Sequence, residues 1–225
     1  FRLYVESKIH CYYYLYFVSI YIMDKQLTGN QISEISKSSY KKNKNVKDID
    51  GYVLDRGLST SEAKVFVNKD KGKVVIANRG TNPTLSDWTN NLALLLGQYQ
   101  NTKRFQNARQ IQVEAKDKYP SFEFLNVGHS QSAKITKLLN EENLTDKIVN
   151  INPATLPSDK KKKNETTIRS NDDIVSTFDK FKKGDIVIES KTGNPILEHK
   201  TDIVSRLGDE KVQGSGHHSK WHWFN

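Results

Sequence analysis

The chain has 225 residues, of which 36% are hydrophobic and 27% charged, and this composition excludes an intrinsically disordered protein and allows one substantial core. Much of its net charge of +9 comes from two lysine runs, KKNKNVK at 41–47 and DKKKKN at 159–164. Neither run is interleaved with aromatic residues, so we expect no specific nucleic-acid partner and only weak contact with anionic membrane surfaces or polymers.

The first 22 residues precede the only methionine of the chain, Met23. Their apolar stretch, Ile9 to Ile22, is shorter than the roughly 20 residues that a membrane-spanning helix needs, and no signal-peptide cleavage site follows it. We therefore expect residues 1–22 to be translated upstream sequence and not an anchor, and residues 23–225 to form a single domain. Cys11 is the only cysteine, which excludes an intrachain disulfide and favours a reducing, cytoplasmic compartment.

The segment up to about Lys47 is polar, with one weakly amphipathic stretch, QISEISKSSY (31–40). AKVFVNKD and VVIANRG predict two strands joined by a short Lys-Gly turn. DWTNNLALLL (87–96) and RFQNARQIQVEAKDKY (104–119) carry helical patterns, and the second ends at Pro120. FEFLNV (122–127) then predicts a short strand that leads directly into GHSQS.

The remaining segments continue the alternation of helices and strands. AKITKLLNEEN has helical spacing, and KIVNINPA predicts a buried strand that Pro153 stops. TTIRSNDDIVS (166–176) and DIVIES (185–190) predict two more strands, and ILEHKTDIVSRL predicts a closing helix. This order indicates an α/β fold, with a mostly parallel central sheet and helices on both of its faces.

The stretch VGHSQSA (127–133) matches G-x-S-x-G except that Ser132 replaces the last glycine. A nucleophile elbow requires a strand, a tight turn and a helix that starts just after the serine, and FEFLNV, GHSQS and AKITKLLN follow in that order. Gly128 supplies one of the small residues that the turn needs, whereas Ser132 adds a Cβ and a hydroxyl. We predict Ser130 as a nucleophile, the alternative being one hydroxyl in an ordinary polar loop.

A second motif, VVIANRGTNPTLSDWTNNL (74–92), is placed to form an oxyanion hole. Acyl transfer needs backbone N–H groups that point at the developing oxyanion. One donor is the residue after the nucleophile, Gln131, and the other is expected from the R-G-T loop that follows the strand. The alternative is a plain strand-end turn in which Arg79 and Asp87 pair locally.

The RGT…DW and GHS motifs together resemble those of class 3 lipases and their viral and bacterial α/β-hydrolase relatives, over roughly residues 50–200. The helix between them, the strand ending in Asn-Pro and the segment RSNDDIVS also resemble parts of that family. The resemblance implies an α/β-hydrolase fold and ester hydrolysis, with Ser130 as nucleophile and Thr81 and Gln131 as oxyanion-hole donors.

The same resemblance implies that the acid of the triad lies in NDDIVS, and matching D-I-V-S to the family pattern selects Asp173 over Asp172. The chain departs from the family at Asn78, where the family has an aromatic residue, and at Ser132, where it has glycine. The second departure bears directly on the geometry of the elbow.

The histidine of the triad is chosen by topology from six candidates: His10, His129, His199, His217, His218 and His222. In α/β-hydrolases the chain order is Ser, Asp, His, with the histidine on the loop after the last strand. That loop is TGNPILEHKTD, which selects His199, while the histidines of the tail GSGHHSKWHWF remain the alternatives. His10 lies in the leader, and the side chain of His129 is expected to point away from the reacting face of the serine.

These assignments predict covalent acyl transfer, in which Ser130 attacks an ester carbonyl, His199 takes its proton and Asp173 orients the imidazole. Arg79, Asp87 and Trp88 are assigned to structural support of the oxyanion loop. We expect neither a metal nor an organic cofactor, because no cysteine or placed carboxylate accompanies the tail histidines.

The resemblance implies acylglycerol- or phospholipid-like substrates and, with the Lys/Asn/Ile-heavy composition, points to viral members of the group. No long amphipathic insertion resembles a lid, which favours an open site and short acyl chains. Two alternatives remain: a catalytically inactive, hydrolase-like binding protein, and an enzyme that uses the same triad on amide or peptide bonds.

Overall fold

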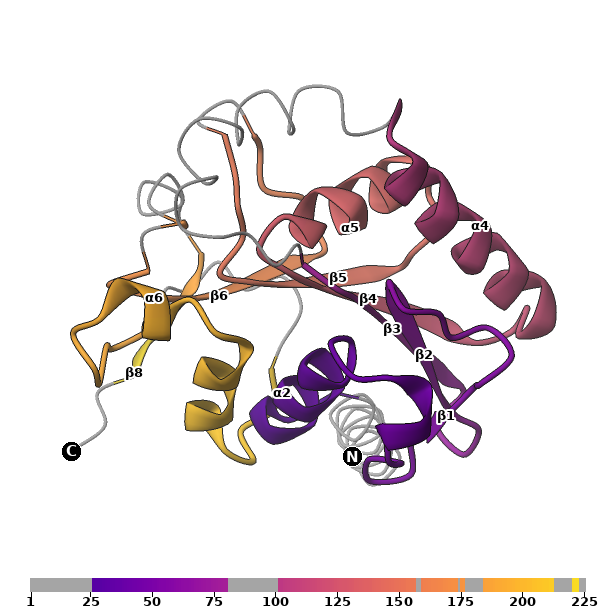
Figure 1. Cartoon of the computed structure of the whole chain (residues 1–225), viewed down its shortest axis with the longest axis horizontal. Coiled ribbons are helices and arrows are strands. Elements are labelled where there is room, and N and C mark those ends of the chain that lie inside the picture. Colours follow the sequence, from indigo (N-terminus) through magenta and orange to yellow (C-terminus); the bar gives the residue numbers. More distant parts are fainter. Residues whose placement is uncertain are drawn as a thin grey trace, which may run out of the picture.

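A mostly parallel β-sheet organises the chain (Figure 1). This computed structural model describes residues 26–80, 101–156, 159–173, 175–176, 184–212 and 220–222. Residues 220–222 are described by their backbone alone. The eight strands of these segments lie in sequence order: β1 (Val53–Leu54), β2 (Ala63–Asn68), β3 (Lys73–Asn78), β4 (Glu123–His129), β5 (Lys147–Ile151), β6 (Glu165–Ser170), β7 (Ile186–Ile188) and β8 (Lys220–His222). Strands β1 to β3 pair antiparallel, and every pairing from β3 to β8 is parallel.

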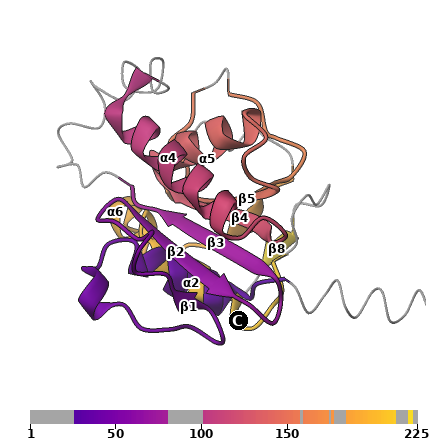
Figure 2. The same cartoon turned by 90° about the vertical axis from the view of Figure 1, so that its right-hand side faces the viewer.

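Helices cover both faces of the sheet (Figures 1 and 2). Helices α4 (Lys103–Lys118) and α5 (Ser132–Glu141) lie on one face, and α2 (Gly29–Ser38) lies on the other with the 3-10 helix η5 (Thr201–Leu207). Two short helices, η1 (Asn43–Asn45) and α6 (Pro195–Glu198), complete the described elements. The α/β fold predicted from the sequence is confirmed.

The alternating strand side chains divide the core into a layer on each side of the sheet. Under α2 and η5, residues such as Ile35 and Ile203 pack against Val75 and Val127 of β3 and β4. On the opposite face, Ile111 and other residues of α4 pack on the neighbouring positions of β2, β3 and β4. Both faces of the parallel strands are therefore buried, which explains why these segments read as continuous apolar runs.

Local signals account for the helix ends. Thr28 and Gln31 form a reciprocal capping box at the start of α2, a stretch that the sequence marked only as weakly amphipathic. Thr102 caps α4 by accepting a hydrogen bond from the Phe105 N–H, and α4 ends just before Pro120, as predicted. The predicted helix at 87–96 lies outside the described residues, as do residues 1–22.

Two predicted elements are wrong in extent. The strand predicted at 166–176 ends at Ser170, because the Asp173 N–H turns back toward the Ser170 carbonyl at 3.4 Å. The single helix predicted over ILEHKTDIVSRL is divided into α6 and η5, with His199 and Lys200 between them. Both differences fall where the chain leaves the sheet and long-range contacts replace local periodicity.

Candidate active site

The turn between β4 and α5 has the geometry of a nucleophile elbow. Ser130 adopts the left-handed conformation, with a φ of 58°, and α5 begins two residues later. Such a conformation costs a non-glycine residue about 1–2 kcal/mol, so the surrounding structure must enforce it. Here the Ser130 N–H donates to the Ile151 carbonyl at 3.0 Å, and the Ser130 carbonyl accepts from Ala154 at 3.1 Å.

The small residues around Ser130 are required by close backbone contacts. A Cβ at Gly128 would lie 2.9 Å from the Ala133 nitrogen and 2.9 Å from the Ser132 carbonyl oxygen. Ser132 is accommodated because its hydroxyl is used: it accepts from the His129 N–H at 2.7 Å and donates to the Asn78 carbonyl at 2.7 Å. The Ser132 hydroxyl thus connects the turn after β4 to the end of β3.

Asn78, at the end of β3, belongs to a chain of buried side-chain amides. Asn78 Nδ2 donates to Asn126 Oδ1 at 2.9 Å, and Asn126 Nδ2 donates to Gln112 Oε1 at 2.7 Å. Gln112 Nε2 then donates to the Leu144 carbonyl at 2.8 Å. An asparagine at the end of β3 is therefore compatible with burial, since its side-chain amide is paired.

His199 and Asp173 are in direct contact. His199 Nδ1 lies 2.8 Å from Asp173 Oδ1, and the Asp173 side chain is fully buried. The carboxylate also accepts from the backbone N–H groups of Val175 and Ser176 at 3.3 and 2.9 Å, which fixes its orientation. Asp172, which the motif did not select, is exposed, and its carboxylate has no such contact with a histidine among the described residues.

Ser130, Asp173 and His199 follow the ends of β4, β6 and β7, which are parallel neighbours by way of β5. The carboxyl ends of parallel strands meet at one edge of a sheet, so these segments converge there. The Ser130 side chain is fully buried, and its hydroxyl has no hydrogen-bond partner among the described residues. The predicted Ser130–His199 hydrogen bond is therefore not formed in this structure.

His129 is enclosed by the site and uses both ring nitrogens. Nε2 lies 2.6 Å from the backbone carbonyl oxygen of His199, and Nδ1 lies 2.6 Å from the Tyr40 hydroxyl. Its ring centroid is 4.9 Å from that of His199. Burial, followed by the nearby His199, lowers the pKa of His129 from 6.5 to about 3, so the ring is neutral at physiological pH.

Three side chains of this region were not singled out from the sequence: Asn152, Glu198 and Tyr40. Asn152, with a φ of 42°, donates through Nδ2 to the Glu198 carbonyl at 2.7 Å. Glu198 is fully buried, and its carboxylate accepts hydrogen bonds from both terminal nitrogens of the Arg206 guanidinium at 2.8 and 3.0 Å. The asparagine of the Asn-Pro pair was the available signal for Asn152, whereas nothing local distinguished Glu198 or Tyr40.

Several predicted site residues lie outside the described residues: Thr81, Asp87, Trp88, His217 and His218. The backbone of His222 belongs to β8, while its side chain is not described. Gln131 is the N-cap residue of α5, directly after Ser130. Arg79 follows β3 and donates its N–H to the Glu62 carbonyl at 2.8 Å, but the predicted pairing with Asp87 lies beyond the described part of the chain.

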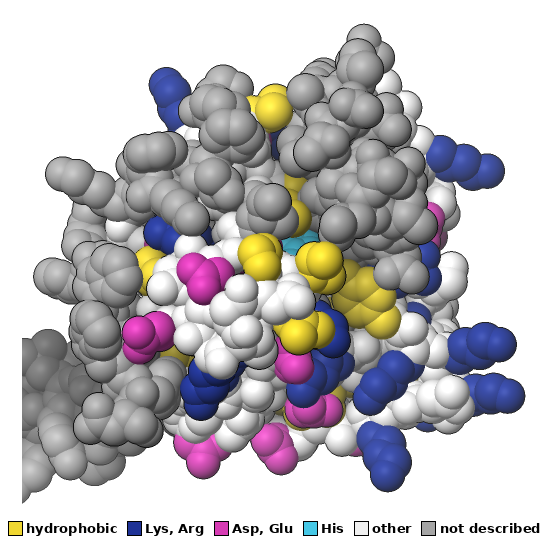
Figure 3. All heavy atoms as spheres, turned by 60° about the vertical axis from the view of Figure 1, so that its left-hand side comes forward, with side chains coloured by type: hydrophobic (Ala, Val, Ile, Leu, Met, Phe, Trp, Pro, Cys, Tyr) yellow, Lys and Arg dark blue, Asp and Glu magenta, His cyan; other side chains and the backbone are white. Residues whose placement is uncertain are grey.

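Large hydrophobic side chains are exposed beside the candidate site. Ile196 and Leu197 of α6, three and two residues before His199, are 49% and 41% exposed, and Tyr40 is 37% exposed. Figure 3 shows hydrophobic side chains gathered around a histidine on one face of the molecule. An apolar surface next to this edge of the sheet is suited to the hydrophobic part of a ligand.

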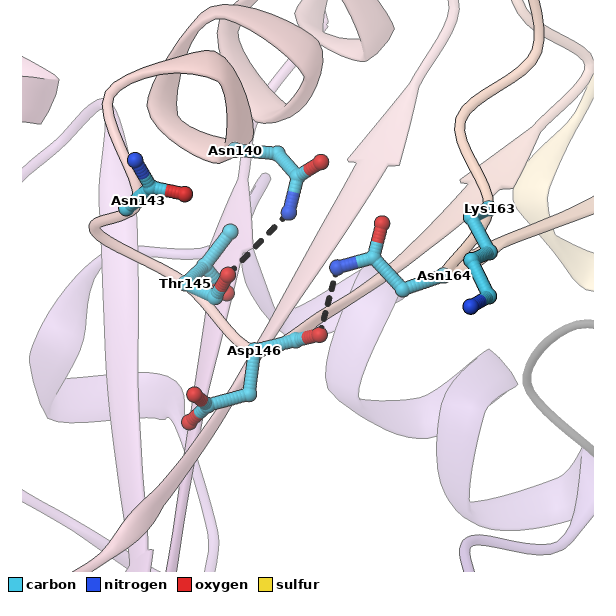
Figure 4. A pocket seen from close by; sticks show the side chains of 6 residues that line it. All are labelled: Asn140, Asn143, Thr145, Asp146, Lys163 and Asn164. Atoms are coloured by element: carbon cyan, nitrogen blue, oxygen red, sulfur yellow. Dashed lines mark hydrogen bonds between the residues drawn. The ribbon is translucent and has the colours of Figure 1, made fainter.

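A polar pocket lies at the other edge of the sheet (Figure 4). It lies beside the end of α5 and the starts of β5 and β6, and its lining residues are Asn140, Asn143, Thr145, Asp146, Lys163 and Asn164. Its one carboxylate, Asp146, already accepts a hydrogen bond from the Phe124 N–H. Over the segments described above, no cluster of three or more His, Cys, Asp or Glu side chains could hold a metal, and no helix has the length and apolar character to cross a membrane.

The solved structures that resemble this chain include fungal lipases. The Rhizomucor miehei lipase propeptide complex is 13% identical, with 83% of this chain and 81% of that chain covered and a TM-score of 0.48. Lip2 lipase from Yarrowia lipolytica is 13% identical, with 70% and 76% covered and a TM-score of 0.44. No family model and no curated protein matches the chain.

Proposed function

We propose that this protein is a serine hydrolase that cleaves carboxylic esters, with Ser130 as nucleophile, His199 as general base and Asp173 as the acid that orients it. The observation that carries the proposal is the 2.8 Å contact between His199 Nδ1 and the buried Asp173, at the sheet edge where Ser130 occupies a strained turn. A carboxylate on Nδ1 leaves Nε2 as the nitrogen that accepts a proton from the nucleophile.

In the proposed cycle, the Ser130 oxygen bonds to the ester carbonyl carbon as its proton passes to His199. The resulting oxyanion is bound by backbone N–H groups, for which Gln131 and Thr81 are the candidates, at about 3–4 kcal/mol per donor. The imidazolium then protonates the leaving alcohol as the ester C–O bond breaks. Water, deprotonated by His199, releases the acid and restores the serine.

The proposal requires Ser130 and His199 to approach one another when substrate is present. In the structure the Ser130 hydroxyl is buried and is not hydrogen bonded to His199. Catalytic hydrogen bonds are commonly long or poorly aligned without substrate and shorten in the substrate complex. The contact with Asp173 fixes the Nδ1 side of the His199 ring, so completion of the triad requires the serine turn or the His199 loop to move until Nε2 reaches the Ser130 hydroxyl.

We predict that Ser130→Ala lowers p-nitrophenyl ester hydrolysis by at least about a thousandfold, because it removes the oxygen that forms the acyl-enzyme. Ser205→Ala, which removes an exposed hydroxyl from η5, serves as the control and should keep full activity. Retention of activity in Ser130→Ala would refute Ser130 as the nucleophile.

An apolar acyl chain is the substrate feature that the site favours. The exposed side chains of Ile196 and Leu197 offer hydrophobic surface next to His199, as acylglycerol- or phospholipid-like esters require. Kinetics with p-nitrophenyl esters of increasing chain length test this, and an amide panel tests the alternative that the same triad cleaves amide or peptide bonds.

A second candidate function, a hydrolase-like binding protein without activity, is favoured by the burial of Ser130 and the missing hydrogen bond to His199. A fluorophosphonate probe separates the two functions, because only an activated serine reacts with it. Stoichiometric labelling that Ser130→Ala abolishes supports the enzyme. Absence of labelling in a folded protein supports the binding function.

A further inference from the structure

A continuous path of hydrogen bonds joins the end of β3 to the His199 loop through two residues, Tyr40 and His129. The Gly80 N–H lies 3.0 Å from the Tyr40 hydroxyl, and that hydroxyl lies 2.6 Å from His129 Nδ1. His129 Nε2 lies 2.6 Å from the His199 carbonyl oxygen. The path therefore begins one residue before Thr81 and ends on the backbone of the proposed general base.

The direction of each hydrogen bond follows from the chemistry of the groups. The His199 carbonyl can only accept, so the proton of the neutral His129 ring is on Nε2. Nδ1 then accepts a hydrogen bond that the Tyr40 hydroxyl donates, while the Tyr40 oxygen accepts one from the Gly80 N–H. One tautomer of His129 and one orientation of the Tyr40 hydroxyl therefore satisfy all three hydrogen bonds.

The path is closely packed as well as bonded. The Tyr40 and His129 rings meet edge to face, with centroids 5.9 Å apart, and the His129 and His199 rings lie 4.9 Å apart. A Cβ at Gly80 would lie 2.6 Å from the Tyr40 hydroxyl and 2.8 Å from the His129 carbonyl oxygen. A side chain at position 80 would therefore force these elements apart.

The orientation of the His199 ring is fixed at two points. Asp173 holds Nδ1, and His129 holds the backbone carbonyl of the same residue. Asn152 holds the preceding carbonyl, that of Glu198. A general base must keep its free nitrogen within hydrogen-bond reach of the nucleophile, and a misplacement of about 1 Å can cost a hundredfold in rate.

We propose that Tyr40 and His129 are positioning residues that hold the His199 loop and the end of β3 in fixed relation around Ser130. The kinetic consequences of this inference rest on the proposed hydrolase function. The placement of His199 by Tyr40 and His129 does not depend on that function. Neither residue contacts substrate in this account. His129 acts through the His199 backbone, and Tyr40 acts through His129 and Gly80.

The test compares variants that keep or remove individual hydrogen bonds. His129→Phe removes both, His129→Gln retains a donor near the Nε2 position, and Tyr40→Phe removes one oxygen from a partly exposed ring. Tyr119→Phe is the matched control, because it deletes a tyrosine hydroxyl, bonded to Asp55, just before the start of β4, whereas Ser130 follows the end of that strand. Each variant is checked by thermal unfolding before kinetics with p-nitrophenyl esters.

We expect Tyr40→Phe and His129→Phe to lower kcat by about ten- to a hundredfold with little change in KM, since substrate binding is not affected. His129→Gln should recover most of the loss, and Tyr119→Phe should behave as wild type. Unchanged kcat in a folded Tyr40→Phe or His129→Phe would overturn the inference, as would a His129→Gln variant that is folded but no more active than His129→Phe.

A measurement that needs no activity separates this inference from the proposed function. The Nδ1–H proton of His199, which is shared with the buried Asp173, should give a downfield imidazole resonance in wild type. The resonance should persist in His129→Gln and Tyr119→Phe and be shifted or lost in His129→Phe. If wild type cleaves no ester but this pattern holds, only the hydrolase proposal fails. If the resonance is unaffected in His129→Phe, the positioning role fails.

Discussion

His129 is next to the proposed nucleophile in sequence, but its chemistry makes it unsuitable as a base. Both ring nitrogens are used, and burial lowers its pKa to about 3. A neutral ring beside His199 is compatible with the proposed cycle, because it adds no positive charge when His199 becomes an imidazolium. A protonated His129 would repel that imidazolium across 4.9 Å between the ring centroids.

At the scale of this residue we predict a loss of stability in mild acid. The unfolded chain binds a proton at His129 near pH 6.5, whereas the folded chain does so only near pH 3. The free energy of unfolding is therefore unaffected by His129 above pH 6.5. It falls by about 1.4 kcal/mol per pH unit as the pH drops from 6.5 toward 3, because only the unfolded chain binds the proton. The groups around His129 are Tyr40, His199 and Asp173.

Urea unfolding at pH 7.5 and pH 5.0 measures this effect, with His129→Gln as the reference that cannot titrate. Wild type should lose about 2 kcal/mol more than the variant between these values. Equal losses in the two proteins would mean that His129 titrates normally in the folded state.

At the scale of elements, the connection from β7 to η5 is held by a buried carboxylate. Glu198 accepts from the backbone N–H groups of Lys191 and Thr192 at 3.2 and 3.1 Å and from the Ser170 hydroxyl at 2.8 Å. Burial alone would raise its pKa, but hydrogen bonds from Arg206, Ser170 and Thr192 lower the pKa to about 2. These contacts fix Glu198, the residue before His199, from three directions.

We predict that Arg206→Met destabilises the protein by about 3 kcal/mol, since it leaves a fully buried carboxylate without its cation. Arg109→Met is the control, because the Arg109–Glu142 pair is 47% and 38% exposed and should contribute less than about 1 kcal/mol. Chemical denaturation at pH 7 compares them. Similar small losses in both variants would show that the other donors to Glu198 are sufficient.

The pH dependence of this pair has the same sign as that of His129. The contribution of Glu198 is present above pH 4.5 and is lost as the pH falls toward 2, since its folded pKa lies below its ordinary value. In Arg206→Met the pKa of Glu198 in the folded chain should rise, so the stability lost from this residue as the pH falls below 4.5 should be smaller than in wild type.

At the scale of the whole molecule, the sheet gathers the candidate site at one edge, while the positive charge is spread over the surface. Figure 3 shows Lys and Arg side chains projecting from several parts of the face that it displays. The lysines of the run at 41–47 are exposed. In the second run, Lys161 and Lys162 pair with Asp185 and Glu141 at 2.8 and 2.6 Å, which reduces its effective charge.

We predict weak, salt-dependent binding to vesicles that contain anionic lipid, because exposed charges attract an anionic surface and salt screens them beyond about 8–10 Å. Co-sedimentation should detect binding at low salt that weakens at 0.15 M salt and is absent with zwitterionic vesicles. Substitution of Lys41, Lys42 and Lys44 by glutamine should reduce it. Binding that does not respond to salt would instead indicate an apolar contact.

The sequence by itself determined the order of strands and helices and the candidate elbow. These features depend on neighbours in the chain: the β-rich run at 122–127, the small residues around Ser130 and the helical spacing after it. A family motif also selected Asp173 over Asp172, and the structure places Asp173 against His199. Such signals are readable because short-range sterics and periodicity set them.

The tertiary structure alone decided how the site is supported. Tyr40 and His129 are 89 residues apart, and His129 and the His199 carbonyl are 70 residues apart, so no local pattern relates them. The break between α6 and η5 depends in the same way on distant partners, since Asn152 and His129 bind the carbonyls of residues 198 and 199. Only the parallel pairing of β3 to β7 brings these groups to one edge, where burial makes their hydrogen bonds obligatory.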